Sequence, residues 1–477
     1  MDKYPIKEFD RLWKLLLINQ FHDIIPGSSI HRVYEDAIPQ LKSIVADCKR
    51  LQNDAAMSFM KKDENMMTLF NPSSTAFSGT IKLPEGWKTA SLNGVMLDTQ
   101  READDYVARV EVAPRGFIVL ELSKDEPASA STQSVGNEMI LENEEVKYVF
   151  NSQFQVVFAI DKTNGFEFVT KDNPANMLRL FDDRPAAWDA WDYDEYVDNA
   201  QVASPEIISI EKISGPVRNG IMAYMKIGTS MCVQTAWLEK TGKRLDFVSD
   251  INWTESHKML RVEFPVNVKT QEANFEIQYG TISRATHNNT KWQYAQYEVV
   301  GHRFADMSEY DFGVALLNDS KYGYRAKNGV MSLSLLRSPT WPDPICDVGQ
   351  HHIVYSLLPH AGCLKESGDI VRANASMINQ GLEKFIGMRV NSDACVPVSF
   401  DGEGVELAVI KRAEKEDCLV VRLVETRGRR ASGTLTTTIG NKFIECQTSE
   451  WNSMGSPIST PAKIEFRPFE IKTFKVK

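Results

Sequence analysis

Residues 19–29 read Asn19-Gln20-Phe21-His22-Asp23-Ile24-Ile25-Pro26-Gly27-Ser28-Ser29 and follow the first apolar segment of the chain. An imidazole beside a carboxylate is an unusual placement there, because polar side chains at a helix end can leave the core and face a cleft. A plainer interpretation is that His22 only caps the helix, where its charge would complement the helix dipole. Taken alone, the chemistry of the pair favours this plainer interpretation.

The flanking sequence predicts two helices. Residues 6–25 carry apolar side chains at helical spacing, and Pro26-Gly27 is expected to end the helix. Ser28-Ser29 is placed to cap a second helix, in which Pro39 is expected to cause a bend or a restart. The second helix carries one apolar stripe: Ile38, Leu41, Ile44, Val45, Cys48, Leu51 and Ala55. An antiparallel hairpin over residues 6–62 follows, and its stripe requires a partner because two helices alone make a poor core.

After Asn65 the apolar pattern changes to a period of two. Turn signals such as Asn71-Pro72 and Asn164-Gly165 separate the strand-like segments. These segments include Thr68–Phe70, Thr80–Leu83, Phe117–Leu122, Val146–Phe150, Phe154–Ile160, Val405–Ile410 and Ile471–Val476. Short strands at close spacing predict a mainly β fold with a short N-terminal α part, built as stacked antiparallel β-sandwiches.

Composition narrows the class of protein. The chain has 477 residues, too many for one hydrophobic core, and its formal net charge of -10 disfavours nucleic acid as a partner. Its apolar runs are shorter than the roughly 18 residues that a membrane span needs. Seven scattered cysteines without a Cys-x-x-Cys pair indicate reduced thiols. With no secretory signal expected at the N-terminus, we predict a cytoplasmic protein.

The string at residues 19–29 resembles the helix motif of glycoside hydrolase family 38, the class II α-mannosidases. Further similarity to this family extends over nearly the whole chain, and it is closest to the cytosolic and bacterial type. The similar segments are Phe70–Pro72, Trp188–Asp192, Phe275–Gly280 with Arg284–Thr290, His302–Glu309, Val314–Tyr324, Leu336–Thr340 and Leu357–His360.

The resemblance divides the chain into four parts. Residues 1–65 are expected to be part of the α-mannosidase middle domain, here a helical hairpin, and residues 66–130 a small β-sandwich. Residues 135–392 are expected to form the large C-terminal β-sandwich of the family, and residues 393–477 a small C-terminal β-domain. A small, polar, aperiodic linker at Ser123–Ser134 and a break near Asn391–Val398 mark two of the boundaries.

The resemblance also implies a function, the zinc-dependent, retaining hydrolysis of terminal α-linked mannose from oligosaccharides. By position, His22 is implied to be a ligand of the catalytic zinc and Asp23 to contact mannose hydroxyls. The nucleophile and the other zinc ligands are implied to lie in an N-terminal α/β domain, of which we find no counterpart here. No catalytic residue is therefore assigned in this chain.

Two requirements follow from this chemistry. A retaining glycosidase uses two carboxyl groups about 5–5.5 Å apart, and a catalytic zinc usually has three protein ligands. We therefore expect this chain alone to bind zinc weakly or not at all and not to hydrolyse mannosides. The expected partners are a mannose-containing oligosaccharide, the missing N-terminal catalytic domain and, through the exposed helical stripe, a second copy of the chain.

Three other groups of residues allow both a functional and a structural interpretation. The segment with Asp319, Lys321, Tyr322 and Tyr324 is explained better by a tight β-turn than by contact with substrate. His351-His352 are expected to point to opposite faces of a strand and not to share a metal ion. Trp188, Trp191 and Tyr193 are candidates for a sugar-stacking platform, although packing in the core or rim is the favoured interpretation.

Two rival functions remain open. One is a carbohydrate-binding β-sandwich module without catalytic activity, and the other is a structural subunit of a split mannosidase. Mannose binding on a glycan array that is unaffected by substitution of His22 or Asp23 would favour the binding module.

Overall fold

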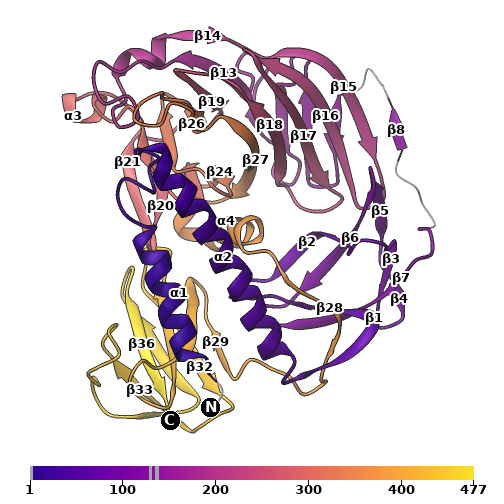
Figure 1. The fold of residues 1–477 in the computed structure, drawn as a ribbon, viewed down its shortest axis with the longest axis vertical. Helices are drawn as coiled ribbons and strands as arrows, with labels where there is room; N and C mark the ends of the chain where they lie inside the picture. Colours follow the sequence, from indigo (N-terminus) through magenta and orange to yellow (C-terminus); the bar gives the residue numbers. More distant parts are fainter. Residues whose placement is uncertain (1–3, 128–131, 135–138) are drawn as a thin grey trace.

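The computed structural model describes residues 4–127, 132–134 and 139–477. Two N-terminal helices, α1 (Ile6–Ile18) and α2 (His31–Ala56), lie across a series of antiparallel sheets (Figure 1). The described part also holds α3 (Lys291–Tyr294), the 3₁₀ helix η1 (Glu195–Asn199) and α4 (Leu364–Asn379). The predicted fold class, mainly β with a short N-terminal α part and stacked antiparallel sandwiches, is confirmed.

Helix α1 ends at Ile18, so the helix predicted over residues 6–25 is too long. The side-chain amide of Asn19 donates to Leu15 O at 2.8 Å and to Gln40 Oε1 at 2.9 Å. An amide that bonds to the backbone in this way competes with continuation of the helix. Residues 20–27 form successive turns instead, and His22 lies in these turns rather than in the last helical turn.

The two helices form the predicted antiparallel hairpin. Arg11 of α1 pairs with Asp47 of α2 at 2.6 Å, and Arg50 of α2 reaches Glu8 at 3.4 Å. The apolar stripe of α2 remains open, because Ile38, Leu41 and Val45 are all exposed in this chain. Pro39 lies inside the continuous helix α2.

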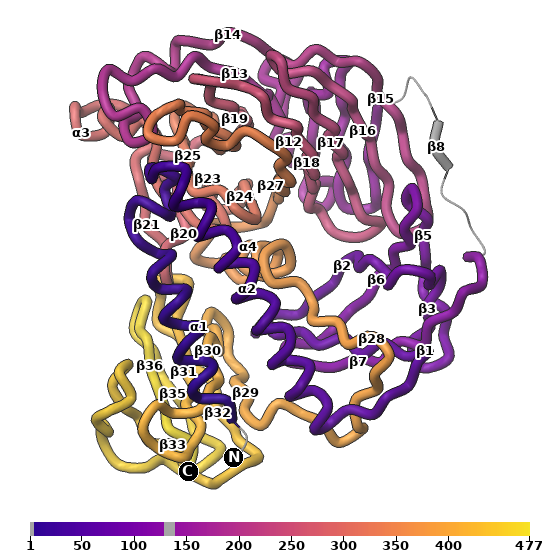
Figure 2. Tube along the Cα trace, viewed as in Figure 1, coloured from indigo at the N-terminus to yellow at the C-terminus, as the bar shows by residue number. Residues whose placement is uncertain are grey.

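The hairpin is attached to the β-domains at both ends (Figure 2). At the turn end, His31 Nδ1 lies 3.2 Å from Asp343 Oδ2, in the loop after β26. At the other end, the guanidinium of Arg412 lies over the ring of Tyr4, 5.9 Å from its centroid. The turn between α1 and α2 is therefore fixed against the large sandwich.

The small sandwich packs two sheets around a core that includes Met67, Leu69, Ala108 and Leu120. Its strands are β1 (Met60–Phe70), β2 (Phe77–Lys82), β3 (Thr89–Leu92), β4 (Val95–Met96), β5 (Thr99–Glu102), β6 (Asp105–Val112) and β7 (Phe117–Ser123). Strand β28 (Glu383–Val390) completes the first sheet by pairing with β1, so the chain returns to this domain after the large sandwich.

The large sandwich contains a ten-stranded sheet in the order β21-β20-β23-β24-β27-β18-β17-β16-β15-β8. These strands are β8 (Thr132–Ser134), β15 (Glu206–Ser214), β16 (Arg218–Ile227), β17 (Ser230–Glu239), β18 (Leu245–Trp253), β20 (Glu272–Ile277), β21 (Gly280–Ala285), β23 (Phe304–Ser308), β24 (Phe312–Asn318) and β27 (Gly349–Ala361). Strand β8 lies in the predicted linker and pairs with β15, whereas residues 128–131 of that linker are outside the described residues.

Two further sheets complete the large sandwich. The six-stranded sheet contains β13 (Met177–Asp182), β14 (Gln201–Ala203), β19 (Lys258–Pro265), β22 (Val299–Val300), β25 (Gly323–Lys327) and β26 (Val330–Arg337). The four-stranded sheet contains β9 (Ile140–Glu142), β10 (Val146–Phe150), β11 (Val156–Asp161) and β12 (Phe166–Val169). One continuous core joins the three sheets, with Trp253, Phe264 and Tyr355 among its fully buried side chains.

The C-terminal β-domain packs two sheets around Leu423, Leu435, Phe443 and Phe474. Its strands are β29 (Val398–Asp401), β30 (Val405–Arg412), β31 (Leu419–Glu425), β32 (Ala431–Thr437), β33 (Lys442–Cys446), β34 (Ile458–Ser459), β35 (Ala462–Phe466) and β36 (Ile471–Val476). All seven cysteines are free thiols. Among the described residues, no helix is both long and apolar enough to cross a bilayer.

Helix α4 was not predicted from the sequence. Its residues Leu364, Val371 and Ala375 pack against buried side chains of β23, β24 and β27. The helix leads the chain from β27 to β28, and it carries Arg372 into the boundary with the C-terminal domain.

A fully buried ion pair inside the large sandwich predicts a pH effect on stability. His360 Nε2 lies 2.7 Å from Asp306 Oδ2, and both side chains are fully buried. Burial lowers the pKa of His360, but the charge of Asp306 and its hydrogen bond outweigh this and leave the pKa above its ordinary value. The stability from the charged pair is therefore fully present below pH about 6.5 and is lost as pH rises through the folded-state pKa.

We expect His360→Gln to lower the free energy of unfolding by roughly 2 kcal/mol at pH 6 and by less at pH 9, measured by denaturant unfolding. His352→Gln is the control, because His352 pairs with Asp250 at 2.7 Å but is 60% exposed. A loss that is equal at both pH values for His360→Gln would contradict the prediction.

Candidate functional site

The predicted pair, His22 and Asp23, lines a hollow of about 620 Å³ between the hairpin and the large sandwich. The turn between α1 and α2 supplies these two residues and Ser28. The loop after β13 supplies Trp188, Ala190, Trp191 and Asp192, and the loop after β26 supplies Trp341 and Pro342. Three segments that are distant in sequence thus meet at one site.

His22 and Asp23 present their side chains to solvent. His22 Nε2 lies 3.5 Å from Asp23 Oδ2, and the two side chains are 69% and 42% exposed. The ring of Phe21 packs on the His22 imidazole with centroids 4.3 Å apart. Because both polar groups are accessible, the carboxylate can accept hydrogen bonds from a ligand and the imidazole can donate a lone pair.

The sequence suggested that the two serines after Gly27 cap α2. In the structure they hold the turn at Asp23 instead. Ser28 Oγ donates to Asp23 Oδ1 at 3.2 Å, and Ser29 Oγ donates to Asp23 O at 2.9 Å. Tyr34 of α2 also donates to Asp23 O, at 3.3 Å. The N-cap of α2 is Ile30, which makes no side-chain capping bond.

Three tryptophans line the hollow beside this pair, and we call Trp188, Trp191 and Trp341 the tryptophan cluster. Their side chains are 63%, 55% and 58% exposed. The ring centroids of Trp188 and Trp341 lie 6.3 Å apart, and Trp191 and His22 meet edge to face with their centroids also 6.3 Å apart. The core placement in the favoured prediction is therefore wrong for Trp188 and Trp191, whereas their position on a loop at the edge of the large sandwich agrees with packing at its rim.

Tyr193, which the sequence grouped with these tryptophans, lies elsewhere. It packs against Phe181, Val197 and Met259. Its hydroxyl donates to Asp198 Oδ1 at 3.0 Å, and Arg261 donates to it at 2.7 Å. Burial raises the pKa of Tyr193. Tyr193 is thus a structural side chain outside the hollow.

Two charged residues fix the loops that carry the cluster. Asp189 Oδ2 accepts Thr340 N at 2.6 Å and Trp341 N at 3.2 Å, which ties the second loop to the first. Arg337 Nη2 donates to the backbone carbonyls of Asp189, at 3.1 Å, and Asp192. Sequence reasoning did not assign Trp341 to the site, because it lies far from Trp188 along the chain.

The hollow offers an incomplete set of metal ligands. Within residues 4–127, 132–134 and 139–477, no three His, Cys, Asp or Glu side chains are grouped so as to hold a metal ion. His22 supplies one candidate ligand, and the carboxylates of Asp23 and Asp192 also line the hollow. His351 and His352 contact different groups, the Asp347 carbonyl and the Asp250 carboxylate, as expected of neighbours whose side chains point to opposite faces of a strand.

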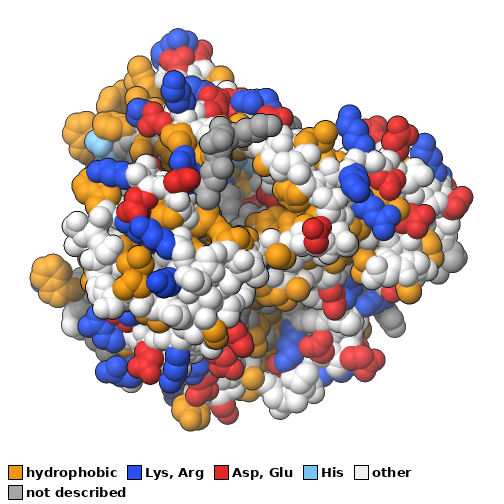
Figure 3. Space-filling model, turned by 90° about the horizontal axis from the view of Figure 1, so that it is seen from below, with side chains coloured by type: hydrophobic (Ala, Val, Ile, Leu, Met, Phe, Trp, Pro, Cys, Tyr) orange, Lys and Arg blue, Asp and Glu red, His pale blue; other side chains and the backbone are white. Residues whose placement is uncertain are grey.

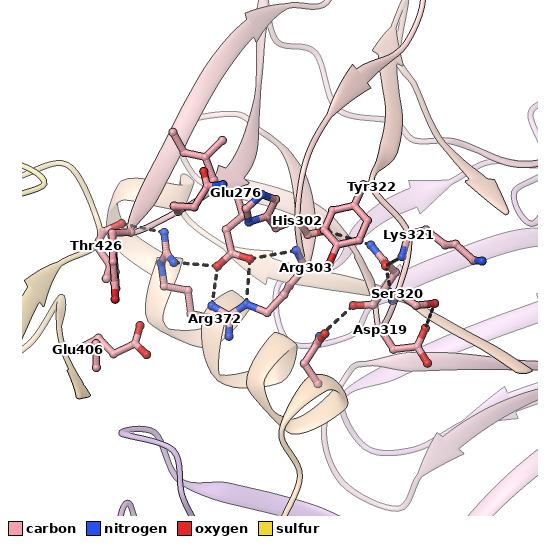
Figure 4. Close-up of a pocket in the computed structure, with 16 residues that line it drawn as sticks. Glu276, His302, Arg303, Asp319, Ser320, Lys321, Tyr322, Arg372, Glu406 and Thr426 are labelled. Atoms are coloured by element: carbon pink, nitrogen blue, oxygen red, sulfur yellow. Dashed lines mark hydrogen bonds and ion pairs between the residues drawn. The ribbon is translucent and has the colours of Figure 1, made fainter. Parts of the chain in front are cut away.

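A second pocket of about 450 Å³ lies between the large sandwich, α4 and the C-terminal domain (Figure 4). Its wall holds Glu276 between the guanidinium groups of Arg303 and Arg372. Burial would raise the pKa of Glu276, but the hydrogen bonds and charges of the two arginines hold it below the ordinary value. These donors are occupied within the protein, so the three charged residues primarily link elements of the large sandwich, and Arg372 extends the link to Thr426 of the C-terminal domain.

The turn after β24 borders this second pocket. Asn318 Oδ1 accepts Ser320 N at 2.9 Å and Lys321 N at 2.5 Å, and Asp319 Oδ1 accepts Val354 N at 3.2 Å. Tyr324 is fully buried and donates to His302 O at 3.0 Å. Residues 319–322 form a bend between β24 and β25, which belong to two different sheets, so the predicted tight β-turn is not confirmed. Tyr324 is too deeply buried to contact a ligand.

The surface is mixed in charge. On the face shown in Figure 3, acidic and basic side chains lie interspersed among apolar and uncharged groups. The ion pairs at Arg32–Asp36 and Lys82–Asp105 are examples of this pattern on exposed side chains.

Three models of one protein family match the chain. The "Alpha mannosidase middle domain" matches residues 1–59, the "Glycosyl hydrolases family 38 C-terminal domain" matches residues 141–345, and the "Glycosyl hydrolases family 38 C-terminal beta sandwich domain" matches residues 404–474. The first of these matches contains His22 and Asp23, and the second contains the tryptophan cluster.

Curated relatives and a solved structure agree with these matches. Alpha-mannosidase G of Dictyostelium discoideum is 31% identical over 100% of this chain and 48% of its own length. The alpha-mannosidase of Saccharomyces cerevisiae is 32% identical over 99% of this chain and 44% of its own length. The chain thus spans about half the length of these relatives. An alpha-mannosidase structure from Enterococcus faecalis has the same fold, with a TM-score of 0.78 at 16% identity, over 100% of this chain and 64% of that one.

Proposed function

This chain belongs to glycoside hydrolase family 38, and from that premise we propose that it forms part of a zinc-dependent, retaining α-mannosidase. The enzyme would release terminal α-linked mannose from oligosaccharides. The observation that carries the proposal is the exposed His22–Asp23 pair in a hollow that three tryptophans also line. The names of the relatives, all α-mannosidases, support the same activity.

In this proposal His22 is one ligand of the zinc ion. Its ring is accessible and makes no short hydrogen bond that would have to be broken first. When bound, zinc would supply a Lewis acid that orients and polarises sugar oxygens. Since a catalytic zinc usually has three protein ligands, the others would come from a separate N-terminal catalytic domain, together with the nucleophilic carboxylate.

Asp23 has a different role in the proposal, that of a hydrogen-bond acceptor for mannose hydroxyls. Ser28, Ser29 and Tyr34 hold its turn, while the carboxylate remains partly exposed toward the hollow. A charged acceptor that is fixed before the ligand arrives loses little entropy on binding. Asp23 would therefore select the orientation of the sugar without taking part in bond cleavage.

The proposal predicts a dependence on His22 in an enzyme that carries these residues together with the N-terminal domain. His22→Ala is expected to lower kcat/KM for an aryl α-mannoside by at least about 100-fold and to reduce the bound zinc, because a direct ligand is lost. Zinc content and steady-state kinetics provide the two measurements. The matched control is His352→Ala, since His352 is also exposed beside a carboxylate, and it should change neither quantity.

Near-normal kinetics and zinc content in His22→Ala would remove the basis of the proposal. The 477-residue chain by itself provides a second test. We expect no turnover of an aryl α-mannoside, with or without added zinc. Zinc-dependent turnover by the chain alone would show that both catalytic carboxylates lie within it and would refute the proposed shared site.

A further inference from the structure

We propose that the tryptophan cluster binds the pyranose ring that adjoins the terminal mannose, so that the hollow recognises an oligosaccharide rather than a single sugar. This inference rests on the proposed function, because it takes the mannose to lie at His22 and Asp23. It assigns a substrate-binding role to Trp188, Trp191 and Trp341.

The first argument is the exposure of the three side chains. Each is more than half exposed, although large aromatic side chains gain most from burial. Trp188 also has a φ of +56°, a backbone conformation that costs free energy in a bulky residue. Exposure and strain at adjoining positions are features of a binding surface.

The second argument is that the tryptophans are held in place. The carboxylate of Asp189 bonds to two backbone N–H groups of the Trp341 loop, and Arg337 bonds to two carbonyls of the Trp188–Asp192 turn. These bonds join the two loops into one rigid rim. An aromatic ring on a fixed backbone loses little conformational entropy when a ligand stacks on it.

The third argument is chemical. The C–H groups on one face of a pyranose carry a small positive charge, which suits the negative face of an indole ring. Hydroxyl groups instead need charged or polar partners such as Asp23. Both kinds of surface line the hollow: the turn between α1 and α2 supplies His22 and Asp23, and two loops of the large sandwich supply the Trp188–Trp341 pair. We therefore assign the mannose to the polar side and its neighbour to the aromatic side.

The size of the hollow agrees with this division. Its volume of about 620 Å³ lies within the range of about 300–1,000 Å³ that is typical of sites for drug-sized ligands. The hollow therefore has room for more than one sugar ring. Trp191 and His22 meet edge to face with ring centroids 6.3 Å apart, so this tryptophan adjoins the proposed mannose position.

The test compares two ligands on the 477-residue chain. Methyl α-mannoside and the α-linked mannobioses, each linkage isomer in turn, are titrated by ligand-observed NMR. We expect at least one mannobiose to bind roughly 5- to 10-fold more tightly than the monosaccharide, a gain that matches one aromatic contact. Trp188→Ala and Trp341→Ala should remove this gain and leave the affinity for methyl α-mannoside unchanged.

Two further variants test whether the stacking itself matters. Trp188→Phe keeps an aromatic face and should retain part of the gain, which separates stacking from damage to the turn. Trp292→Ala is the matched control, because Trp292 is 85% exposed on α3 and does not line the hollow, and it should bind both ligands as the unaltered chain does.

The outcomes for this inference and for the proposed function are distinct. Asp23→Asn should weaken both ligands by the same factor if the mannose position is correct. Equal affinities of all the mannobioses and methyl α-mannoside, or a gain that survives in Trp188→Ala and Trp341→Ala, would overturn the inference. If the tryptophan-dependent gain is observed but Asp23→Asn changes the affinity of neither ligand, the tryptophan cluster would be supported as a sugar site, and the result would count against the proposed function.

Discussion

Replacing Glu276 by glutamine is expected to lower the free energy of unfolding by about 3–5 kcal/mol. Glu276 is almost fully buried and accepts hydrogen bonds from Arg303 at 2.6 Å and 2.9 Å and from Arg372 at 3.0 Å. Glutamine keeps the shape of the side chain but removes its charge. Two guanidinium groups, one of them 8% exposed, would then remain close together without their directly paired carboxylate, with only the more distant charges of Glu406 and Asp369 to offset them.

The position of this cluster explains why the effect should be large. Glu276 belongs to β20, Arg303 precedes β23 and Arg372 belongs to α4. Arg372 also donates to Thr426 O, at 3.1 Å, in the C-terminal domain. The charge of Glu276 therefore holds together three elements of the large sandwich and the contact with the next domain.

Urea unfolding followed by tryptophan fluorescence measures the effect. Glu403→Gln is the control, because Glu403 also pairs with two arginines, at 3.7 Å and 3.4 Å, but is 81% exposed. We expect that substitution to cost at most about 1 kcal/mol. Because the pKa of Glu276 is lowered, its contribution is present above the ordinary carboxyl pKa and is lost as pH falls through the folded-state value. Equal losses for the two variants would refute the prediction.

The sequence predicted the fold class well because alternation of apolar residues is a local property. The strands expected at Phe117–Leu122 and Val146–Phe150 coincide with β7 and β10. Helix α4 was missed because its buried face is short and rests on residues such as Val371 and Ala375, whose partners come from other strands. The pairing of β28 with β1 also joins segments that are distant in sequence, and the apolar periodicity of a segment does not indicate its partner strand.

The candidate site, like the fold, could be predicted from the sequence only in part. The placement of His22 and Asp23 in a hollow followed from a motif within one short segment. The exposure of Trp188 did not, because a tryptophan in a strand-rich chain is usually packed, and only the folded loops show what surrounds it. Trp341 lies at the site because its backbone N–H donates to the Asp189 carboxylate, which holds the two loops together. Sequence spacing cannot reveal this pairing of loops.

Replacing Arg337 by alanine is expected to lower the free energy of unfolding by about 3–5 kcal/mol and to abolish binding at the tryptophan cluster. The Arg337 guanidinium donates to both carboxylate oxygens of Asp183, whose side chain is 1% exposed. Alanine would leave this carboxylate buried without a counter-charge. Arg184→Ala is the control, because the neighbouring Arg184 is 58% exposed and contacts Asp182 only at 3.4 Å.

A double substitution separates the two effects of Arg337. Arg337→Ala with Asp183→Asn removes the buried charge together with its partner, so much of the lost stability should return. Binding of a mannobiose should not return, because the carbonyls of Asp189 and Asp192 still lack the donor that fixes the Trp188 turn. Denaturant unfolding and the NMR titration give the two readouts. Recovery of both together would mean that Arg337 acts only through Asp183, and that the tryptophan cluster keeps its geometry without the bonds to the turn.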